Sequence, residues 1–358
     1  MRSSLVRIAL SLTVVALPAT ARVTAQTPQP TVVAAQEYRV NFAVPDAPAF
    51  EILGIEPSDL LRPVSVRELT ASLSNLGGLT QGLTLPRSFA VEFSPGMLIN
   101  GPRLNLTDYR NNQILYRLRI SGAANRATDS ARTQLGFGVR LSLIDKADPR
   151  TDDQFIAQIT QIDAQITHII AAAPLPMVSG VVDPVKVLDA SGQQQIQQLQ
   201  QQITALKKAH EERSWNARLL DIAYAVGASA EDSTGRGARV DAHSLWATYA
   251  NPISRWGQLL VGVRGGMARD SVADGFAGTV SAAARLYAGS NDYKFFAETR
   301  IASGGPVADR FLLHGGAEAA LPFSLWANAS AGWEVPTGGG RGRLVTRFSV
   351  KSGLPSTK

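Results

Sequence analysis

The sequence predicts an all-β fold: an antiparallel up-and-down transmembrane β-barrel of about 12 strands with an inserted helical hairpin. Two observations predict this fold. Much of the chain consists of segments in which apolar and polar residues alternate, which is the period of a strand with two different faces. The chain also opens with an export signal, and long alternating strands in an exported chain are typical of the bacterial outer membrane.

Residues 1–25 have the three parts of a secretory signal. Arg2 and Arg7 supply the positive charge, and an apolar stretch of about a dozen residues follows, shorter than the ~20 that a membrane-spanning helix needs. Cleavage after Ala21 and cleavage after Ala25 both fit, and we favour Ala25. The alternative interpretation of this segment is an uncleaved membrane anchor. No other stretch approaches the length of apolar sequence that a transmembrane helix needs.

The leader that follows the signal is rich in proline at first and is expected to be extended. A short helix is expected over 66–75. Ser65 and Glu68 form a capping box before it, and Leu69 and Leu73 would lie one turn apart on one helical face.

About eleven alternating segments of roughly 10–14 residues make up most of the remaining chain, whereas strands of soluble proteins average about 5–6 residues. A tilted transmembrane strand needs ~9–11 residues, so the lengths favour a membrane barrel. An even strand number is expected, which places one more strand between Tyr38 and Gly82. The first three apolar sets are Phe89/Val91/Phe93, Ile114/Tyr116/Leu118/Ile120 and Phe137/Val139/Leu141/Leu143.

The segment 147–213 has the period of helices instead. Thr151 and Gln154 fit a capping box for a first helix, and a second helix is expected to start near Ser191. Each helix carries one apolar stripe, and a proline-containing loop joins them, which predicts an antiparallel hairpin packed as a short coiled coil. The stripes are Phe155, Ile159, Ile162, Ile166 and Ile169, then Ile196, Leu199, Ile203 and Leu206.

Charged residues lie opposite the apolar positions of the strands, and in a barrel they would line the lumen. Basic residues outnumber acidic ones, and rings of arginine and lysine favour anions in a pore. The alternative is that these charges pair across the lumen and brace a closed barrel. The candidate lumen-lining residues are Glu92, Arg117, Arg119, Arg140, Arg218, Arg264, Arg285, Lys294, Glu298, Arg300, Glu318, Arg343 and Arg347.

The connections between strands alternate between short turns and longer polar loops. Outer-membrane barrels have short periplasmic turns and longer external loops, so this alternation places the helical hairpin at the periplasmic mouth. Aromatic residues near the strand ends fit an interfacial girdle. They are Trp215, Trp256, Tyr287, Tyr293, Trp326 and Trp333.

Several other functions are disfavoured by the composition. The chain has no cysteine, and its formal charge of +6 falls to +3 once the three arginines of the signal are removed. Arginine and lysine are spread along the chain, which argues against nucleic-acid binding. The histidines, at positions 168, 210, 243 and 314, share no metal-ligand spacing, and neither a phosphate-binding loop nor a serine-hydrolase elbow is present. The sequence therefore predicts no enzymatic activity, no cofactor and no metal site.

Two motifs resemble a family of uncharacterised bacterial outer-membrane β-barrel proteins. They are the Arg-Pro motif in Leu61–Leu69 and the first-strand motif in Phe89–Pro95, and the helical insert ends near Trp215-Asn216, as it does in that family. The resemblance implies an outer-membrane barrel and no assigned activity. The chain departs from many barrels in lacking a terminal aromatic residue, since Phe348 is the nearest to the end.

These patterns divide the chain into successive regions, and outer-membrane lipid and the barrel-assembly machinery are the expected partners. We expect a channel or transporter with a mildly basic lumen. One alternative is a structural or adaptor barrel, whose hairpin plugs the lumen or binds a periplasmic protein; another is a soluble exported β protein. The regions are 1–25 (signal), 26–82 (leader), 83–146 (first strands), 147–213 (hairpin), 214–354 (remaining strands) and 355–358 (tail).

Overall fold

The computed structural model describes most of the chain, in eleven ranges. The signal, the Arg-Pro motif before Leu69 and the tail from 355 lie outside these residues, so the predictions made for them stay predictions. The ranges are 47–53, 69–74, 88–100, 105–126, 133–172, 189–231, 236–270, 275–304, 309–322, 325–337 and 340–352.

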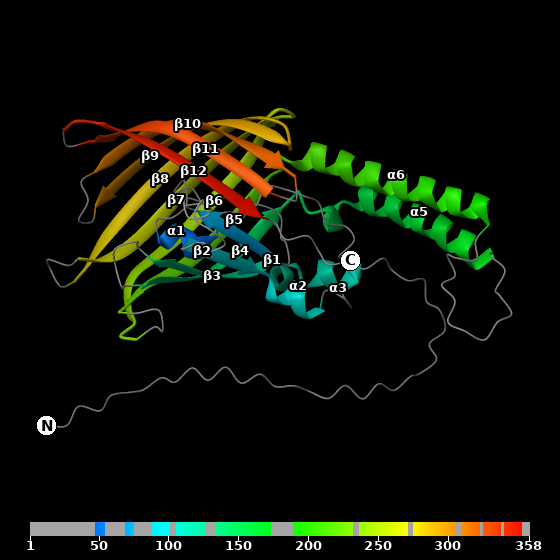
Figure 1. Ribbon diagram of the computed structural model, residues 1–358, viewed down its shortest axis with the longest axis horizontal. Helices are drawn as coiled ribbons and strands as arrows, with labels where there is room; N and C mark the ends of the chain where they lie inside the picture. Colours follow the sequence, from blue (N-terminus) through cyan, green and yellow to red (C-terminus); the bar gives the residue numbers. More distant parts are fainter. Residues whose placement is uncertain are drawn as a thin grey trace, which may run out of the picture. The chain divides into compact units, whose positions relative to one another are not determined.

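The main element is one antiparallel meander, in which each of the strands β2 to β12 pairs with the next along the chain (Figure 1). The predicted antiparallel β fold is thus confirmed at this level. Most strands from β4 onward have 12 residues or more, and apolar and polar residues alternate along most of their length, with register shifts in β4, β5 and β6. The strands are β2 Ser88–Phe93, β3 Leu118–Arg126, β4 Thr133–Asp145, β5 Leu219–Ala230, β6 Arg239–Ser254, β7 Gly257–Asp270, β8 Gly275–Gly289, β9 Tyr293–Gly304, β10 Arg310–Leu321, β11 Leu325–Pro336 and β12 Arg343–Ser352.

A further strand, β1 (Leu69–Ser74), pairs antiparallel with β2 and with β12, so that the strand order returns to its start. β1 falls in the interval where the additional strand was expected. The prediction of a helix over 66–75 is wrong for these six residues. Leu69 and Leu73 are four apart, a spacing that fits a helix and a strand equally well. The two neighbouring strands supply backbone partners along both edges of β1, whereas a helix of two turns is only marginally stable alone.

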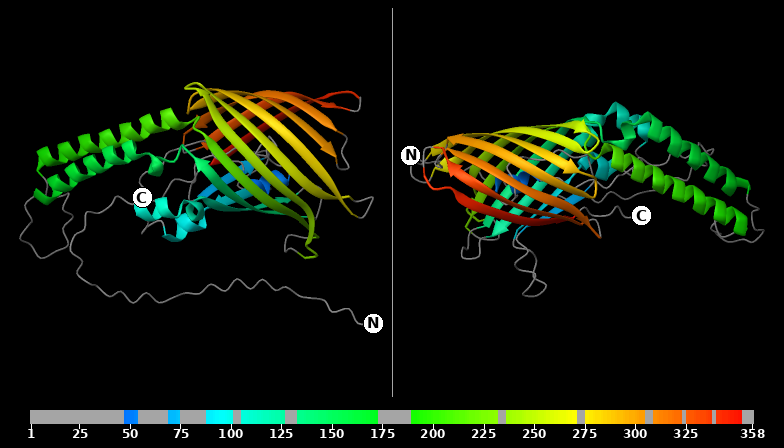
Figure 2. Two further views of the ribbon diagram at one scale, coloured as in Figure 1. Left: turned by 180° about the vertical axis from the view of Figure 1, so that it is seen from behind. Right: turned by 90° about the horizontal axis from the view of Figure 1, so that it is seen from above.

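The two faces of the curved sheet differ in residue type. We call the concave side the inner face and the convex side the outer face (Figures 1 and 2). Large apolar side chains are exposed on the outer face, among them Phe137 and Phe295, each 63% exposed. Charged side chains are buried on the inner face, where Arg140 and Glu298 are each 1% exposed. This distribution is the reverse of that in a soluble protein.

Between β2 and β3 the chain forms three short helices that the sequence analysis missed: α2 (Pro95–Asn100), α3 (Leu106–Asn111) and α4 (Gln113–Arg117). The strand expected from Ile114 onward therefore begins at Leu118. The alternation of Ile114, Tyr116 and Leu118 crosses this boundary unchanged. Asn105 caps α3 by accepting a hydrogen bond from the Asp108 amide, which is a local signal for a helix start.

The inserted hairpin consists of α5 (Asp153–Ala172) and α6 (Ala190–Ser214), which pack side by side (Figures 1 and 2). It lies between β4 and β5, as the sequence predicted. Asp152 caps α5 by accepting a hydrogen bond from the Phe155 amide, so the predicted Thr151 cap is wrong. Thr151 belongs instead to a 3-10 turn, Pro149–Thr151. No helix in the described ranges is long and apolar enough to cross a membrane.

A last helix, α1 (Pro48–Ile52), lies within the curve of the sheet, against β3, β4 and β5 (Figure 1). Ala47 and Ala49 are buried there together with Ala123 of β3. Sequence analysis placed these residues in an extended leader and gave no reason to expect them on the inner face.

Candidate functional site

The candidate site is the inner face of the sheet, which carries two separate groups of buried charged side chains. The first group, the β2–β5 quartet, comprises Glu92, Arg119, Arg140 and Asp221 from four neighbouring strands. Arg119 contacts Glu92 at 3.5 Å and Asp221 at 3.0 Å, and Arg140 contacts the same two carboxylates at 3.5 and 3.7 Å. All four side chains are almost fully buried. Each arginine thus contacts both carboxylates, and the two arginines lie between Glu92 and Asp221 across the wall.

The second group, the β8–β11 cluster, comprises Arg285, Tyr287, Glu298, Glu318 and Asn328. Arg285 forms an ion pair with Glu298, and its Nη1 lies 3.6 Å from Glu318 and 2.7 Å from the Tyr287 hydroxyl. Glu318 accepts hydrogen bonds from the Tyr287 hydroxyl at 2.7 Å and from the Asn328 amide at 3.0 Å. The cluster therefore links four neighbouring strands, β8 to β11, through one buried network.

Lys294 lies at the end of the inner face from which the helical hairpin projects, surrounded by aromatic rings. Its ammonium lies 5.4 Å from the ring centroid of Trp215, 5.1 Å from Trp326 and 6.0 Å from Tyr287. Trp215 follows α6 directly, so these cation–π contacts attach the root of the hairpin to β8, β9 and β11. Trp215, Tyr287 and Trp326 are buried here, which contradicts their predicted place in an interfacial girdle, whereas Trp256, Tyr293 and Trp333 are exposed.

On β9 and β11, burial on the inner face decreases with distance from the hairpin. Along β9, Lys294, Phe296 and Glu298 are buried, whereas Arg300 and Ala302 are half-buried. The same change occurs along β11, where Trp326 and Asn328 are buried and the residues from Ser330 onward are not. On these two strands the inner face is thus filled most densely at the hairpin end, whereas the inner positions of β4 and β5 are buried over most of their length.

The structure brings most of the predicted lumen-lining residues to the inner face, with two exceptions. Arg117 is buried but lies in α4, not in a strand. Arg218 precedes β5 and is exposed. Arg343 shares the inner face of β12 with Arg347, but its side chain is exposed at the end of the strand. The half-buried arginines toward the far end are Arg264, Arg300 and Arg347.

A third buried group, the Tyr109–Asp148 cluster, lies outside the sheet and was missed by the sequence analysis. The Tyr109 hydroxyl donates a hydrogen bond to Asp148, and the Arg150 Nε donates to the other carboxylate oxygen at 2.8 Å. Arg117 lies 3.7 Å from the same carboxylate, and the Arg150 guanidinium covers the Tyr109 ring. The cluster joins the α3–α4 segment to the base of the hairpin. The Asp148-Pro149 turn signal could have indicated the bend, but nothing local indicates its distant partners.

Electrostatics hold this cluster in one protonation state. Burial opposes ionisation of Asp148, yet the adjacent Arg150 charge and the Tyr109 hydrogen bond hold its pKa below the usual range. Burial also raises the pKa of the Tyr109 hydroxyl above its ordinary value. At neutral pH the group is therefore an ionised carboxylate between two guanidiniums and a neutral phenol.

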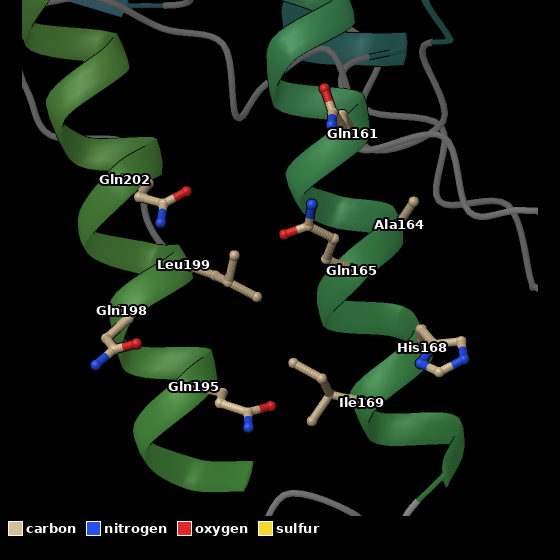
Figure 3. Close-up of a pocket in the computed structure, with 9 residues that line it drawn as sticks. All are labelled: Gln161, Ala164, Gln165, His168, Ile169, Gln195, Gln198, Leu199 and Gln202. Carbon is tan, nitrogen blue, oxygen red and sulfur yellow. The ribbon is translucent and has the colours of Figure 1, made fainter. Parts of the chain in front are cut away.

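The hairpin covers its own apolar stripes, since Phe155, Ile159 and Ile162 of α5 and Ile196 and Leu199 of α6 are buried. Toward its tip the two helices leave a cavity of about 640 Å³ (Figure 3). Figure 3 shows Ile169 and Leu199 pointing toward the space between the helices, with Gln165 and Gln195 beside them. The cavity lining thus combines aliphatic side chains with glutamine amides and the imidazole of His168.

The inner face presents fixed, paired charges. Ion pairs across neighbouring strands hold the wall in place. Within the described ranges, no three histidine, aspartate or glutamate side chains converge as a metal site would require.

Comparison with known proteins brings no family to this site. None of the protein-family models matches the chain, and a search of curated proteins finds no relative. The resemblance drawn from the Arg-Pro and first-strand motifs therefore stays a prediction.

Proposed function

We propose that this chain is an outer-membrane β-barrel with a braced, occluded lumen, which anchors the helical hairpin at the periplasmic side of the membrane. The observation that carries the proposal is the reversed polarity of the sheet. Large apolar side chains are exposed on the outer face, and charges are buried on the inner face. Lipid would cover the outer face, and the charges would need no water because they pair with one another.

The distribution of aromatic side chains supports the same proposal. On the outer face Trp256, Tyr293 and Phe295 lie near the hairpin end, while Phe276 and Trp333 lie near the opposite end. Mostly aliphatic residues and alanines lie between the two sets, together with Tyr224 of β5 and Phe348 of β12. Two aromatic rows separated by an apolar band match the two interfaces of a bilayer.

The paired charges favour an adaptor or structural barrel over an open channel. Eight buried charged residues of the inner face, four basic and four acidic, form the β2–β5 quartet, the β8–β11 cluster and the Lys294 site. A pore selective for anions would need an excess of positive charge along its path. Balanced charge instead stiffens the wall from which the hairpin projects.

A channel or transporter with a mildly basic lumen is the second candidate function. It is favoured by the far half of the inner face, where Arg264, Arg300 and Arg347 are only half-buried. These arginines would draw anions into that end of the lumen.

Gel migration tests the barrel. We expect the refolded protein to migrate faster before boiling than after it and to partition into detergent, as outer-membrane barrels do. Identical migration in both samples together with solubility without detergent would support a soluble exported β protein instead. Conductance in planar bilayers then separates the two functions: an adaptor gives no steady current, and a basic channel gives an anion-selective current. For an adaptor, deletion of 153–213 should also abolish cross-linking to a periplasmic protein.

A further inference from the structure

We infer that the inner wall formed by β3, β4 and β5 is a peptide-binding site, occupied by residues 47–53 of the same chain, and that this segment blocks the lumen. The inference rests on the proposed barrel and names what occludes it. In the sequence analysis, plugging of the lumen by the helical hairpin is one alternative; the contacts of α1 point to the leader instead.

Where α1 lies against β4, the inner positions of the strand are glycines. Gly136 and Gly138 occupy successive inner positions of β4, and the next two inner positions carry Arg140 and Ser142. A Cβ atom at Gly136 would lie 2.3 Å from the carbonyl oxygen of Ala49. Because that contact is with backbone, no rotation of a side chain could relieve it. Even alanine at this position would force α1 to move.

Gly138 forms the second part of the surface of β4 that contacts α1. A Cβ atom there would lie 2.8 Å from the Pro48 Cβ and 3.1 Å from the Ala49 nitrogen. The Ala49 amide donates a hydrogen bond to the Ser121 hydroxyl of β3 at 3.2 Å. The two glycines therefore allow the backbone of α1 to approach β4 closely, and Ser121 of β3 accepts a hydrogen bond from the buried Ala49 amide.

The other side of the segment is held by apolar contacts with β5 and β6. Ile52 packs against Ala223, Ala225 and Trp246, which are all buried. Ala47, Pro48 and Ala49 are buried and Ile52 and Leu53 are half-buried, so the start of the segment is enclosed on the inner face. The site thus accepts a backbone with small side chains at Ala47 and Ala49, followed by the aliphatic side chains of Ile52 and Leu53.

The test compares Gly136→Ala with Gly122→Ala. Gly122 lies in the neighbouring strand β3, and a Cβ atom there would meet nothing within 4 Å. Hydrogen exchange of refolded protein in detergent micelles reports the amides of residues 47–53, and planar-bilayer current reports the lumen. Heat-modifiable gel migration of each variant shows whether the sheet has folded.

We expect the amides of 47–53 to be protected from exchange in the unmodified protein and in Gly122→Ala. In Gly136→Ala they should lose protection while β4 keeps it, and current should rise above that of the unmodified protein. Unprotected amides at 47–53 in the unmodified, heat-modifiable protein would overturn the inference and leave the barrel intact. An unchanged current after 47–53 has lost protection would show that the segment does not block the lumen. Absence of heat-modifiable migration in every variant would count against the barrel itself.

Discussion

The outer and inner faces of the sheet are built from the same strands, yet they follow opposite rules. In β4, Phe137 and Val139 are exposed on the outer face, while Arg140 and Ser142 are buried on the inner one. A soluble sheet would bury the first pair and expose the second. The reversal teaches that the inner face is filled by paired charges and by the α1 segment, while the large apolar side chains are exposed on the outer face.

The largest effect is expected when a buried charge of the inner face is left without its partner. Arg140→Ala removes one cation from the β2–β5 quartet, where it contacts both Glu92 and Asp221. Removing one member of a buried pair costs about 3–5 kcal/mol, and we expect a loss of that size in urea unfolding of the refolded protein.

The control for that variant is Arg343→Ala. The Arg343 side chain is 67% exposed and pairs with Glu334, which also pairs with Arg310. An exposed pair contributes about 0–1 kcal/mol, so the loss should be much smaller. Equal losses in the two variants would mean that the inner-face pairs are hydrated and do not brace the wall.

Placing a charge on each face in turn tests the comparison directly. Ala329 lies on the outer face near the middle of β11, and Ser330 follows it on the inner face. Arginine at the bilayer midplane costs about 2–4 kcal/mol on a lipid-facing site. At Ser330 the repulsion from Arg347, its cross-strand neighbour, costs roughly 0.2–1 kcal/mol. The yield of heat-modifiable protein should therefore fall much further for Ala329→Arg; similar yields would contradict the assignment of the faces.

The Tyr109–Asp148 cluster extends the comparison to the connections outside the sheet. Tyr109→Phe removes a buried hydrogen bond to an ionised carboxylate, which we expect to cost about 1–3 kcal/mol. Tyr116→Phe is the matched control, because its ring stacks on that of Tyr109 but its hydroxyl takes no part in the cluster. Denaturant unfolding at neutral pH measures both, and an equal effect of the two changes would argue against the cluster.

The same cluster predicts a dependence on pH. The pKa of Asp148 is lowered in the folded chain, so its ionised form contributes stability above the ordinary aspartate pKa of about 4. That contribution is lost as the pH falls below this value through the lowered pKa. Tyr109→Phe should therefore lose less stability than the unmodified protein when the pH is lowered through this range.

The smallest expected effect concerns the hairpin, whose stability is local. Asp189 caps α6 by accepting a hydrogen bond from the Gly192 amide at 2.7 Å. Asp189→Ala should cost about 0.5–2 kcal/mol within the hairpin and leave the sheet unaffected. Hydrogen exchange should become faster in the first turns of α6 alone, and faster exchange in β5 as well would show that the hairpin and the sheet unfold together.

The fold could be predicted from the sequence wherever one period ran without interruption. Alternation in β8 and β11 and the helical stripes of α5 and α6 fixed those elements, because a long segment satisfies only one period well. Prediction from the sequence failed where a short segment fitted both the helical and the strand period, as with Leu69 and Leu73 in β1. It also failed at Ile114, where an alternating pattern continued through a helix into a strand.

The inner face could be predicted only as a list of positions. Residues opposite an apolar stripe must share a face, so Glu92, Arg119 and Arg140 were identified without a structure. The ion-pair partners of these residues could not be identified from the sequence. Pairing depends on strand register, which decides which side chains of neighbouring strands lie next to one another. Likewise Gly136 and Gly138 are ordinary strand glycines in the sequence, and only α1 on the inner face gives them a role.

The most direct test of the account is a spin-label scan along β11, from Leu325 to Pro336, in lipid vesicles. Oxygen concentrates in the bilayer, whereas a nickel chelate stays in water, so the two relaxing agents distinguish the faces. We predict that accessibility to oxygen peaks at Ala327, Ala329 and Ala331 and is low at the residues between them. High accessibility of those three alanines to the nickel chelate would contradict the assignment of the outer face to lipid.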